Sequence, residues 1–425
     1  MFQSKLFSKT RREDPKDEVS KNAKLLIKAG FIHKEIAGVY SFLPLGLRVL
    51  NKIKKIVREE MNVLGALELN LTTLQNSSLY EKTNRWSDEE VDIWFKTELK
   101  TGGELGLGFS HEEAIVELMK KHINSYKDLP RAVYQIQTKF RNEERAKNGI
   151  LRGREFLMKD LYSFHATEGE LDDFYDKVKG AYERIFERIG IGDLTYTTFA
   201  SGGIFSKYSH EFQTLCEAGE DLVYLAEEKK IAINKEVLTD ETLSELGLVT
   251  EELVEKKSVE VGNIFKLGTR FSEPLNLLYK DEKGKMLPAV MGCYGFGLTR
   301  AMGVIVEITS DEKGLVWPRS VAPFDVHLII LDKETGSLKG NHSSNETTKS
   351  ALEIYNELIA AGKEVLCDDR GLSAGEKLAD ADLLGLPYRL IVSDRAIKEG
   401  KFELTERVTG ETEYLSETEL FNKFR

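Results

Sequence analysis

A run of basic residues marks the part of the chain best suited to bind anions. Seven lysines and arginines lie between Lys139 and Lys159, in and beside the segment FRNEERAKNGILRGREFLMKDLYSF. The Asn-Gly pair at 148–149 favours a hairpin turn, and strand alternation puts Arg141 and Glu143 on one face. Guanidinium groups on such a strand pair can bind phosphate or carboxylate oxygens through paired hydrogen bonds. A solvated basic hairpin without a ligand is the alternative that these residues leave open.

A glycine-rich segment, MGCYGFGLTRA, is the second candidate. Its glycines Gly292, Gly295 and Gly297 allow a ligand to approach the backbone closely. A helix from Leu298 onward would offer its N-terminus to phosphate. Arg300 stands where a dinucleotide fingerprint needs its third glycine, and the Lys-Ser/Thr of a P-loop is missing. A tight packing turn between a strand and a helix explains the glycines equally well.

A His-Glu pair occurs twice, in FSHEEA and in YSHEFQ. Neither copy extends to H-E-x-x-H, which argues against a zinc hydrolase. The three cysteines, Cys216, Cys293 and Cys367, lie far apart and form no C-x-x-C pair. We therefore expect neither a disulfide framework nor a structural zinc site.

The elements that position these residues can be read from apolar spacing. Residues 45–64 and 170–189 repeat apolar side chains at three and four residues, which predicts two amphipathic helices. The runs RAVYQIQTKFRNE and REFLMKDLYSFH read as strands. Helices and strands without regular alternation predict a mixed sheet flanked by helices. The charged stretch 227–258 has weaker periodicity and reads as a linker or small surface excursion outside the core.

The pattern changes after residue 320. A strand in PFDVHLIIL is followed by a polar loop, DKETGSLKGNHSSNET, and a helix in TKSALEIYNELIAAG; then come a strand in KEVLCDD, a helix in AGEKLADADLLG and a strand in YRLIVSD. This βαβαβ order predicts a separate α/β domain with largely parallel strands. We therefore expect domains at 1–320 and 321–425.

The composition describes an acidic chain without a membrane anchor. Its 425 residues are 41% hydrophobic and carry a net charge of −11. The chain has no window near 18 consecutive apolar residues and no apolar run in MFQSKLFSKTRRED, so we expect a cytoplasmic protein with no membrane partner. Acidity does not exclude RNA, because RNA recognition also uses splayed bases and stacking. The basic charge is concentrated in the hairpin and in the 45–64 helix, at Lys52, Lys54, Lys55 and Arg58.

Taken in order, these segments resemble the catalytic core of the class II aminoacyl-tRNA synthetases. FRNE with REFLMKD is similar to motif 2 of that class, and GCYGFGLTR to motif 3. AGVYSFLPLGLRVL and EVGNIFKLGTRFSE resemble the prolyl-tRNA synthetase family in particular, and LCDDR and ADADLLGLP resemble its anticodon-binding domain. The resemblance implies an α+β core with an antiparallel sheet flanked by helices, plus a C-terminal mixed-sheet α/β domain.

The resemblance also implies a function and a set of site residues. Members of the family join L-proline to tRNA(Pro) through a prolyl-adenylate, using ATP with Mg²⁺ and no zinc, and act as homodimers. Arg141, Glu143 and Arg300 would be catalytic. The implied ATP-binding residues are Arg141, Glu143, Arg152, Phe156, Gln213, Gly295, Gly297 and Arg300, with Glu211 toward Mg²⁺. The implied proline contacts are Ser110, Glu112, Arg141 and His210. The expected tRNA contacts are Arg145 near the acceptor stem, and Asp369, Arg370 and Lys377 in the C-terminal domain.

The sequence departs from the family pattern at three places. Thr72 stands where motif 1 has its proline at the dimer interface, and Phe109-Ser110 replaces Pro-Thr before Glu112. About 127 residues separate Phe164 from Gly292, and most match the catalytic core. Only 227–258 is left where relatives carry an editing domain, which is too short for a domain. A smaller apolar substrate is rejected only about 10–200-fold by size alone, so we expect alanine to be misactivated.

Three other readings are weighed against this one. The chain could be a class II synthetase for another small amino acid, or a synthetase-like tRNA-binding paralogue without activity. The presence of Arg141, Glu143 and Arg300 argues against the paralogue. A dinucleotide-dependent oxidoreductase is disfavoured because the glycine fingerprint is missing.

Overall fold

The computed structural model describes residues 1–201, 208–229, 231–332 and 346–425, which divide into two compact units. The first comprises Glu35–Tyr40 and Ile53–Val304, and the second comprises Met1–Lys34, Ser41–Lys52 and Ile305–Arg425. The domain boundary near residue 320 stays a prediction.

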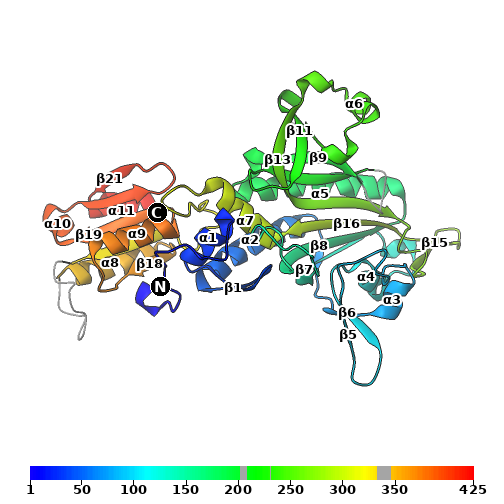
Figure 1. Ribbon diagram of the computed structural model, residues 1–425, viewed down its shortest axis with the longest axis horizontal. Helices are drawn as coiled ribbons and strands as arrows, with labels where there is room; N and C mark the ends of the chain where they lie inside the picture. The colour runs from blue at the N-terminus through cyan, green and yellow to red at the C-terminus, as the bar shows by residue number, and fades with distance from the viewer. Residues whose placement is uncertain (202–207, 230, 333–345) are drawn as a thin grey trace. The chain divides into compact units, whose positions relative to one another are not determined.

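A nine-stranded sheet forms the centre of the first unit within the described residues (Figure 1). Neighbouring strands are antiparallel except for β12 beside β9 and β3 beside β7. In spatial order the strands are β10 (Tyr208–Leu215), β9 (Thr195–Ser201), β12 (Ile231–Asn234), β11 (Asp221–Ala226), β13 (Val254–Gly268), β16 (Val290–Gly297), β8 (Glu155–His165), β7 (Arg131–Phe140) and β3 (Leu67–Glu68). The predicted strands of the basic segment are thus β7 and β8, paired next to the β3 edge of the sheet.

The two predicted amphipathic helices are confirmed as α2 (Pro44–Val63) and α5 (Glu168–Ile189). Thr167 caps the start of α5 by accepting a hydrogen bond from the Glu170 amide, and Gly190 ends it in the left-handed conformation at φ 85°. α5 packs along one face of the sheet against β8, β13 and β16 (Figure 1). That face is therefore closed, and the opposite face is available for a site.

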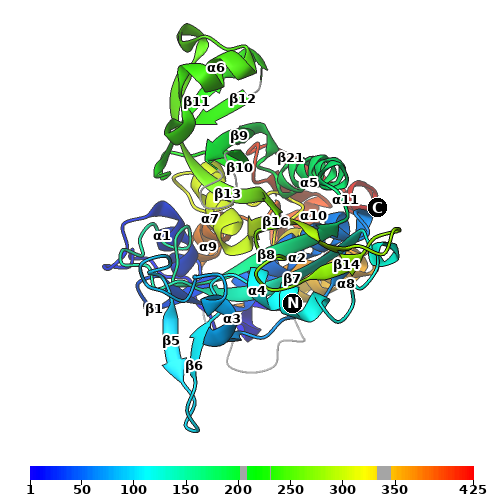
Figure 2. The ribbon, with the colours of Figure 1, turned by 90° about the vertical axis from the view of Figure 1, so that its right-hand side faces the viewer.

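The stretch 227–258, interpreted from the sequence as a linker or small surface excursion outside the core, protrudes as a lobe but has an apolar cluster of its own (Figure 2). β12 and α6 (Asp240–Leu246) fold there around a small apolar cluster of Ala226, Ile233, Val237, Leu243 and Leu248. β12 also joins the large sheet beside β9 and β11. Figure 2 shows this excursion as a lobe at the end of the sheet remote from β7. The pattern was hard to read because its apolar residues serve several short elements and not one helix face.

The predicted βαβαβ order after residue 320 is confirmed. β17 (Val326–Leu331) lies between β18 (Val365–Asp368) and β19 (Tyr388–Ser393), parallel to both. β20 (Phe402–Glu406) and β21 (Thr412–Leu415) extend the sheet antiparallel, so it is mixed. The helices are α8 (Glu346–Ala360), α9 (Ala374–Leu384), α10 (Asp394–Glu399) and α11 (Glu417–Phe424). Most of the predicted polar loop, 333–345, lies outside the described residues.

The remaining elements are short and connect or cover these sheets. The helices are α1 (Lys21–Lys28), α3 (Ser77–Glu81), α4 (Glu112–Met119) and α7 (Leu298–Thr309). The strands are β1 (Ile32–Ile36), β2 (Val39–Phe42), β4 (Leu74–Asn76), β5 (Phe95–Glu98), β6 (Glu104–Leu107), β14 (Leu278–Lys280) and β15 (Met286–Pro288). Across the described ranges, no helix combines the length and apolarity needed to cross a membrane.

Candidate active site

A cavity of about 420 Å³ lies on the face of the large sheet opposite α5. Its floor is built from β8, β13 and β16, where the register puts Asp160 and Asn263 beside Gly295 and puts Tyr162 beside Cys293. Nine of the residues singled out in the sequence line it: Ser110, Glu112, Arg141, Glu143, Arg152, Phe156, Gly295, Gly297 and Arg300. Segments more than 180 residues apart in the chain thus meet around one space.

Glu112 forms a buried anionic end of this cavity. It is the first residue of α4 and only 3% exposed. Its Oε2 accepts hydrogen bonds from the Ser110 hydroxyl and from Arg85 Nη1 (3.0 Å), and its Oε1 accepts one from Cys293 Sγ (3.3 Å). Burial opposes ionisation, but Arg85 and Ser110 outweigh it and lower the pKa of Glu112 to about 2. The side chain is a fixed carboxylate suited to a cationic group.

Arg141 lines the same cavity as Glu112 and Arg300. The prediction that Arg141 and Glu143 lie in a strand is wrong, because β7 ends at Phe140. The chain turns there instead: the Glu143 amide donates to the carbonyl of Arg141 at 2.7 Å. Burial, and then Arg300, lower the pKa of Arg141. Its guanidinium lies over the Phe156 ring, 5.2 Å from the centroid, and its buried Nε has no hydrogen-bond partner in the described chain.

The cationic end is held by backbone carbonyls. Helix α7 begins at Leu298, as expected, and its third residue is Arg300. Arg300 Nε donates to the Leu151 carbonyl (2.8 Å), and Nη1 donates to the Glu260 carbonyl (2.7 Å). Nη1 also lies 3.4 Å from Glu260 Oε2, so the carbonyls fix the guanidinium while this long, partly exposed ion pair neutralises only part of its charge.

The loop between β7 and β8 confirms the predicted turn. Asn148 and Gly149 both have positive φ, 60° and 62°. The backbones of Lys147 and Arg152 form an isolated antiparallel β-bridge on either side of the turn. Arg152 donates two hydrogen bonds to Glu143 Oε2, at 3.0 and 2.8 Å. Arg145 is exposed on this loop.

The β10 residues lie behind the cavity wall. His210, Glu211 and Gln213 are not among its described lining residues. His210 Nδ1 is 2.8 Å from the Tyr175 hydroxyl, and burial lowers the pKa of His210 to about 4. Glu211 accepts hydrogen bonds from Gln213 (2.9 Å) and from Asn263 (3.3 Å), which does line the cavity.

Sequence reasoning missed several residues that build the site. Arg85, Asp160, Glu260, Asn263 and Cys293 all line the cavity. Strand alternation could have predicted Asp160, which lies on the same face of β8 as Phe156. Arg85 has no such signal, because it lies in the irregular segment between α3 and β5.

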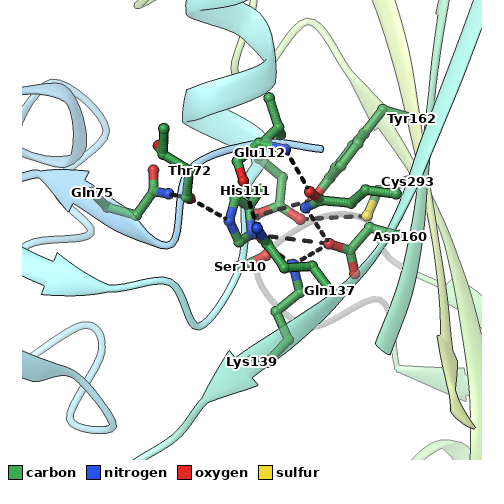
Figure 3. Close-up of polar contacts among 12 residues, drawn as sticks. Thr72, Gln75, Ser110, His111, Glu112, Gln137, Lys139, Asp160, Tyr162 and Cys293 are labelled. Carbon is green, nitrogen blue, oxygen red and sulfur yellow. Dashed lines mark hydrogen bonds and ion pairs between the residues drawn. The ribbon is translucent and has the colours of Figure 1, made fainter. Parts of the chain in front are cut away.

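A buried polar network holds the segment from Ser110 to Glu112, where α4 begins (Figure 3). Lys139 from β7 contacts the Asp160 carboxylate and lies 2.6 Å from His111 Nδ1. His111 Nε2 lies 3.1 Å from the carbonyl oxygen of Thr72. Thr72 itself lies between β3 and β4 and belongs to no strand.

The residues expected to contact tRNA in the C-terminal domain differ in exposure. Asp369 accepts two hydrogen bonds from Ser4, and Arg370 pairs with Asp368 and Asp380. Lys377 is only 1% exposed and donates to the Ile330 carbonyl at 2.7 Å. The prediction that Lys377 contacts tRNA is wrong for this structure, since its ammonium is used inside the domain.

The basic face predicted for the 45–64 helix is partly neutralised. Lys52 pairs with Glu364 at 2.6 Å, and Arg58 pairs with Glu68 at 2.9 Å. This helix therefore offers less free positive charge than its sequence indicates.

Comparisons with known families agree with this architecture. Residues 95–309 match the family "tRNA synthetase class II core domain (G, H, P, S and T)", and residues 325–425 match "Anticodon binding domain". The fold and cavity are therefore those of a class II aminoacyl-tRNA synthetase, as the motifs predicted.

The relatives identify the branch of that class. The chain is 33% identical to proline–tRNA ligase 1 of Bacillus cereus and to that of Bacillus thuringiensis, over 99% of this chain and 98% of each relative. Each alignment spans 569 positions against the 425 residues here, so the relatives have segments that this chain lacks. The chain belongs to the prolyl-tRNA synthetase family.

Solved structures share the fold. A prolyl-tRNA synthetase from Cryptosporidium parvum complexed with L-proline and AMP superposes with a TM-score of 0.74 at 21% identity, covering 95% of this chain and 73% of that one. One from Giardia lamblia, in complex with prolyl-adenylate, also gives 0.74 at 21% identity, covering 93% and 74%.

Proposed function

We propose that this chain ligates L-proline to tRNA(Pro) in two steps. A proline carboxylate oxygen attacks the α-phosphorus of ATP, and pyrophosphate leaves with the electron pair of the broken P–O bond. A ribose hydroxyl at the tRNA 3′ end then attacks the prolyl carbonyl carbon, and AMP leaves. Such transfers depend on positioning and charge stabilisation, not on a protein nucleophile.

The observation that carries this proposal is the position of Arg141. Its guanidinium lies in the cavity that the Glu112 carboxylate also lines, with a buried Nε that has no hydrogen-bond partner in the described chain. We assign Arg141 to bind the α-phosphate and the proline carboxylate, and Glu112 with Ser110 to accept the secondary ammonium. His210 is left out of this assignment, because its ring contacts Tyr175 of α5, on the face of the sheet opposite the cavity.

The other end of the cavity suits ATP. We assign Phe156 and Arg300 to opposite faces of adenine, Glu143 to accept hydrogen bonds from ATP, and Arg152 to phosphate. A Cβ built on Gly295 would meet only ordinary contacts at 3.8 Å and 3.9 Å, so the glycine leaves space above the strand. Gly297 borders the same space.

ATP enters such sites as its magnesium complex. Burial, and then the charge of Glu260, raise the pKa of Glu211 to about 8. A bound cation would offset both effects, so we assign Glu211 to the magnesium, with Gln213 orienting its carboxylate. Arg145 on the exposed loop, with Asp369 and Arg370, is assigned to tRNA, and the enzyme is placed in the cytoplasm.

A homodimer is part of the proposal. β3 is the edge of the described sheet next to β7, and Leu67 on it is 66% exposed. An apolar exposed edge strand is suited to pairing with a second copy. Sedimentation should give a dimer for the wild type and a monomer for Leu67→Glu; a monomeric wild type would contradict the assignment.

ATP–pyrophosphate exchange tests the function and its alternatives. Proline should support exchange far better than alanine or cysteine, whereas a synthetase for another small amino acid would reverse this order. Arg141→Ala should reduce proline-dependent exchange by about 100-fold or more without changing the melting temperature. Arg131→Ala, at the other end of β7, is the matched control. Near-normal exchange by Arg141→Ala would sink the assigned role, and no exchange by the wild type with any amino acid would favour the inactive paralogue.

A further inference from the structure

We propose that Arg85 is a positioning residue for proline: it holds the Glu112 carboxylate where the substrate's secondary ammonium is bound, using Glu113 as its second anchor. The inference rests on the proposed function of Glu112. Arg85 acts through Glu112 and is not assigned a bond to the substrate.

One guanidinium nitrogen joins the two carboxylates. Arg85 Nη1 lies 3.0 Å from Glu112 Oε2, 3.1 Å from Glu113 Oε1 and 3.0 Å from Glu113 Oε2. All three side chains are at most 6% exposed. The guanidinium carbon also lies 4.9 Å from the Phe109 ring centroid and 5.3 Å from that of Phe271. Water is therefore largely excluded from the cluster, and its charges interact strongly.

Both backbone polar groups of Arg85, its amide and its carbonyl, form hydrogen bonds. Its amide donates to the Tyr80 carbonyl at 2.9 Å, and its carbonyl accepts from Trp94 Nε1 at 2.8 Å. Tyr80, Trp94 and Phe109 pack edge to face or tilted, with centroids 4.5–6.3 Å apart. A side chain rooted in this aromatic cluster can fix the direction of the Glu112 carboxylate.

The charges in the cluster make it receptive to a cation. Two adjacent buried carboxylates share one guanidinium, so full ionisation leaves one negative charge uncompensated. Thr83 donates to Glu113 (2.7 Å) and Ser110 donates to Glu112. Burial raises the pKa of Glu113 despite Arg85, whereas Arg85 and Ser110 outweigh burial at Glu112. Of the two carboxylates, Glu112 therefore ionises more readily, and it is the one that lines the cavity where a secondary ammonium can bind.

Steady-state pyrophosphate exchange with Arg85→Met and Arg85→Lys tests the role. Truncating a buried charge partner should raise the KM for proline about 30-fold or more in Arg85→Met. Arg85→Lys keeps the positive charge but loses the planar guanidinium with its several hydrogen-bond donors, so the KM for proline should rise less than in Arg85→Met. The KM for ATP and kcat should stay within about threefold of wild type, because only the proline end changes.

The matched control is Arg188→Met. Arg188 also joins two adjacent glutamates, Glu59 and Glu60, but it is more exposed and remote from the cavity. Its KM values should equal those of the wild type.

Charge rescue and pH separate positioning from simple loss of structure. In Arg85→Met the two carboxylates must share a proton, so kcat/KM for proline should rise with pH between 6 and 8, while the wild type shows no such rise. The double variant Arg85→Met/Glu113→Gln leaves Glu112 as the sole carboxylate and should recover part of the proline KM. An unchanged proline KM in Arg85→Met, an equal rise in both KM values, or no recovery in the double variant would overturn the inference.

Glu112→Gln distinguishes this inference from the proposed function. If Glu112→Gln leaves the proline KM unchanged, the assignment of Glu112 itself fails. If Glu112→Gln weakens proline binding and Arg85→Met does not, only the role of Arg85 fails.

Discussion

Replacing Lys139 with methionine should destabilise the first unit, because it removes the cation from a buried ion pair. Lys139 is 0% exposed and Asp160 is 4% exposed. Lys139 Nζ contacts Asp160 Oδ2, which also accepts a hydrogen bond from Gln135 Nε2 at 3.1 Å. Methionine keeps most of the length and removes the charge, so the variant isolates the electrostatic loss.

The expected cost follows from the burial of both partners. Breaking a buried pair by removing one partner costs about 3–5 kcal/mol, since the remaining charge is left uncompensated. His111 is a poor replacement for the lost cation, because burial is the largest cause that lowers its pKa and burial persists in the variant. In a unit of about 250 residues, each kcal/mol lowers Tm by about 2–4 °C, so the loss should be about 6–20 °C.

Urea unfolding followed by tryptophan fluorescence measures this loss. The series is wild type, Lys139→Met, Asp160→Leu and the double variant, which should lose less stability than the sum of the single variants because no charge remains buried. Lys179→Met is the control: this partly exposed lysine lies 3.8 Å from the exposed Asp176, and its replacement should cost less than about 1 kcal/mol. A loss below about 1 kcal/mol in Lys139→Met, or strict additivity in the double variant, would refute the reasoning.

Two further predictions concern a second buried lysine and substrate selection. Burial lowers the pKa of Lys159 to about 7, so between pH 7 and 10 the unfolded chain binds more protons than the folded one. The stability of the wild type should therefore gain up to about 1.4 kcal/mol per pH unit from this group, and Lys159→Met should lose that slope in urea unfolding at pH 7, 8 and 9; equal slopes would contradict the assignment. The purified chain should also form alanyl-tRNA(Pro) and leave it intact, because size alone discriminates only about 10–200-fold; rapid deacylation of that product by the chain itself would show a hidden editing activity.

Local patterns in the sequence carried most of the fold. The helices α2 and α5, the strands β7 and β8, the start of α7 at Leu298 and the parallel strands after residue 320 all follow from apolar period, turn residues and caps. These signals depend on residues a few positions apart, so a single sequence contains them in full. The apolar cluster of the 227–258 excursion was missed because its residues face a core that several short elements share.

The sequence by itself determined the family, the order of the motifs and nine of the residues that line the cavity. Tertiary structure alone decided how their charges are balanced. Glu112 accepts hydrogen bonds from Arg85, 27 residues away in the chain, and from Cys293, 181 residues away. Asp160 on β8 pairs with Lys139 on the neighbouring strand β7. It also turned Arg141 out of the strand and placed Lys377 inside its domain. The physical reason is that partners of a buried charge are set by sheet register and packing, and neither is visible in the spacing of residues along the chain.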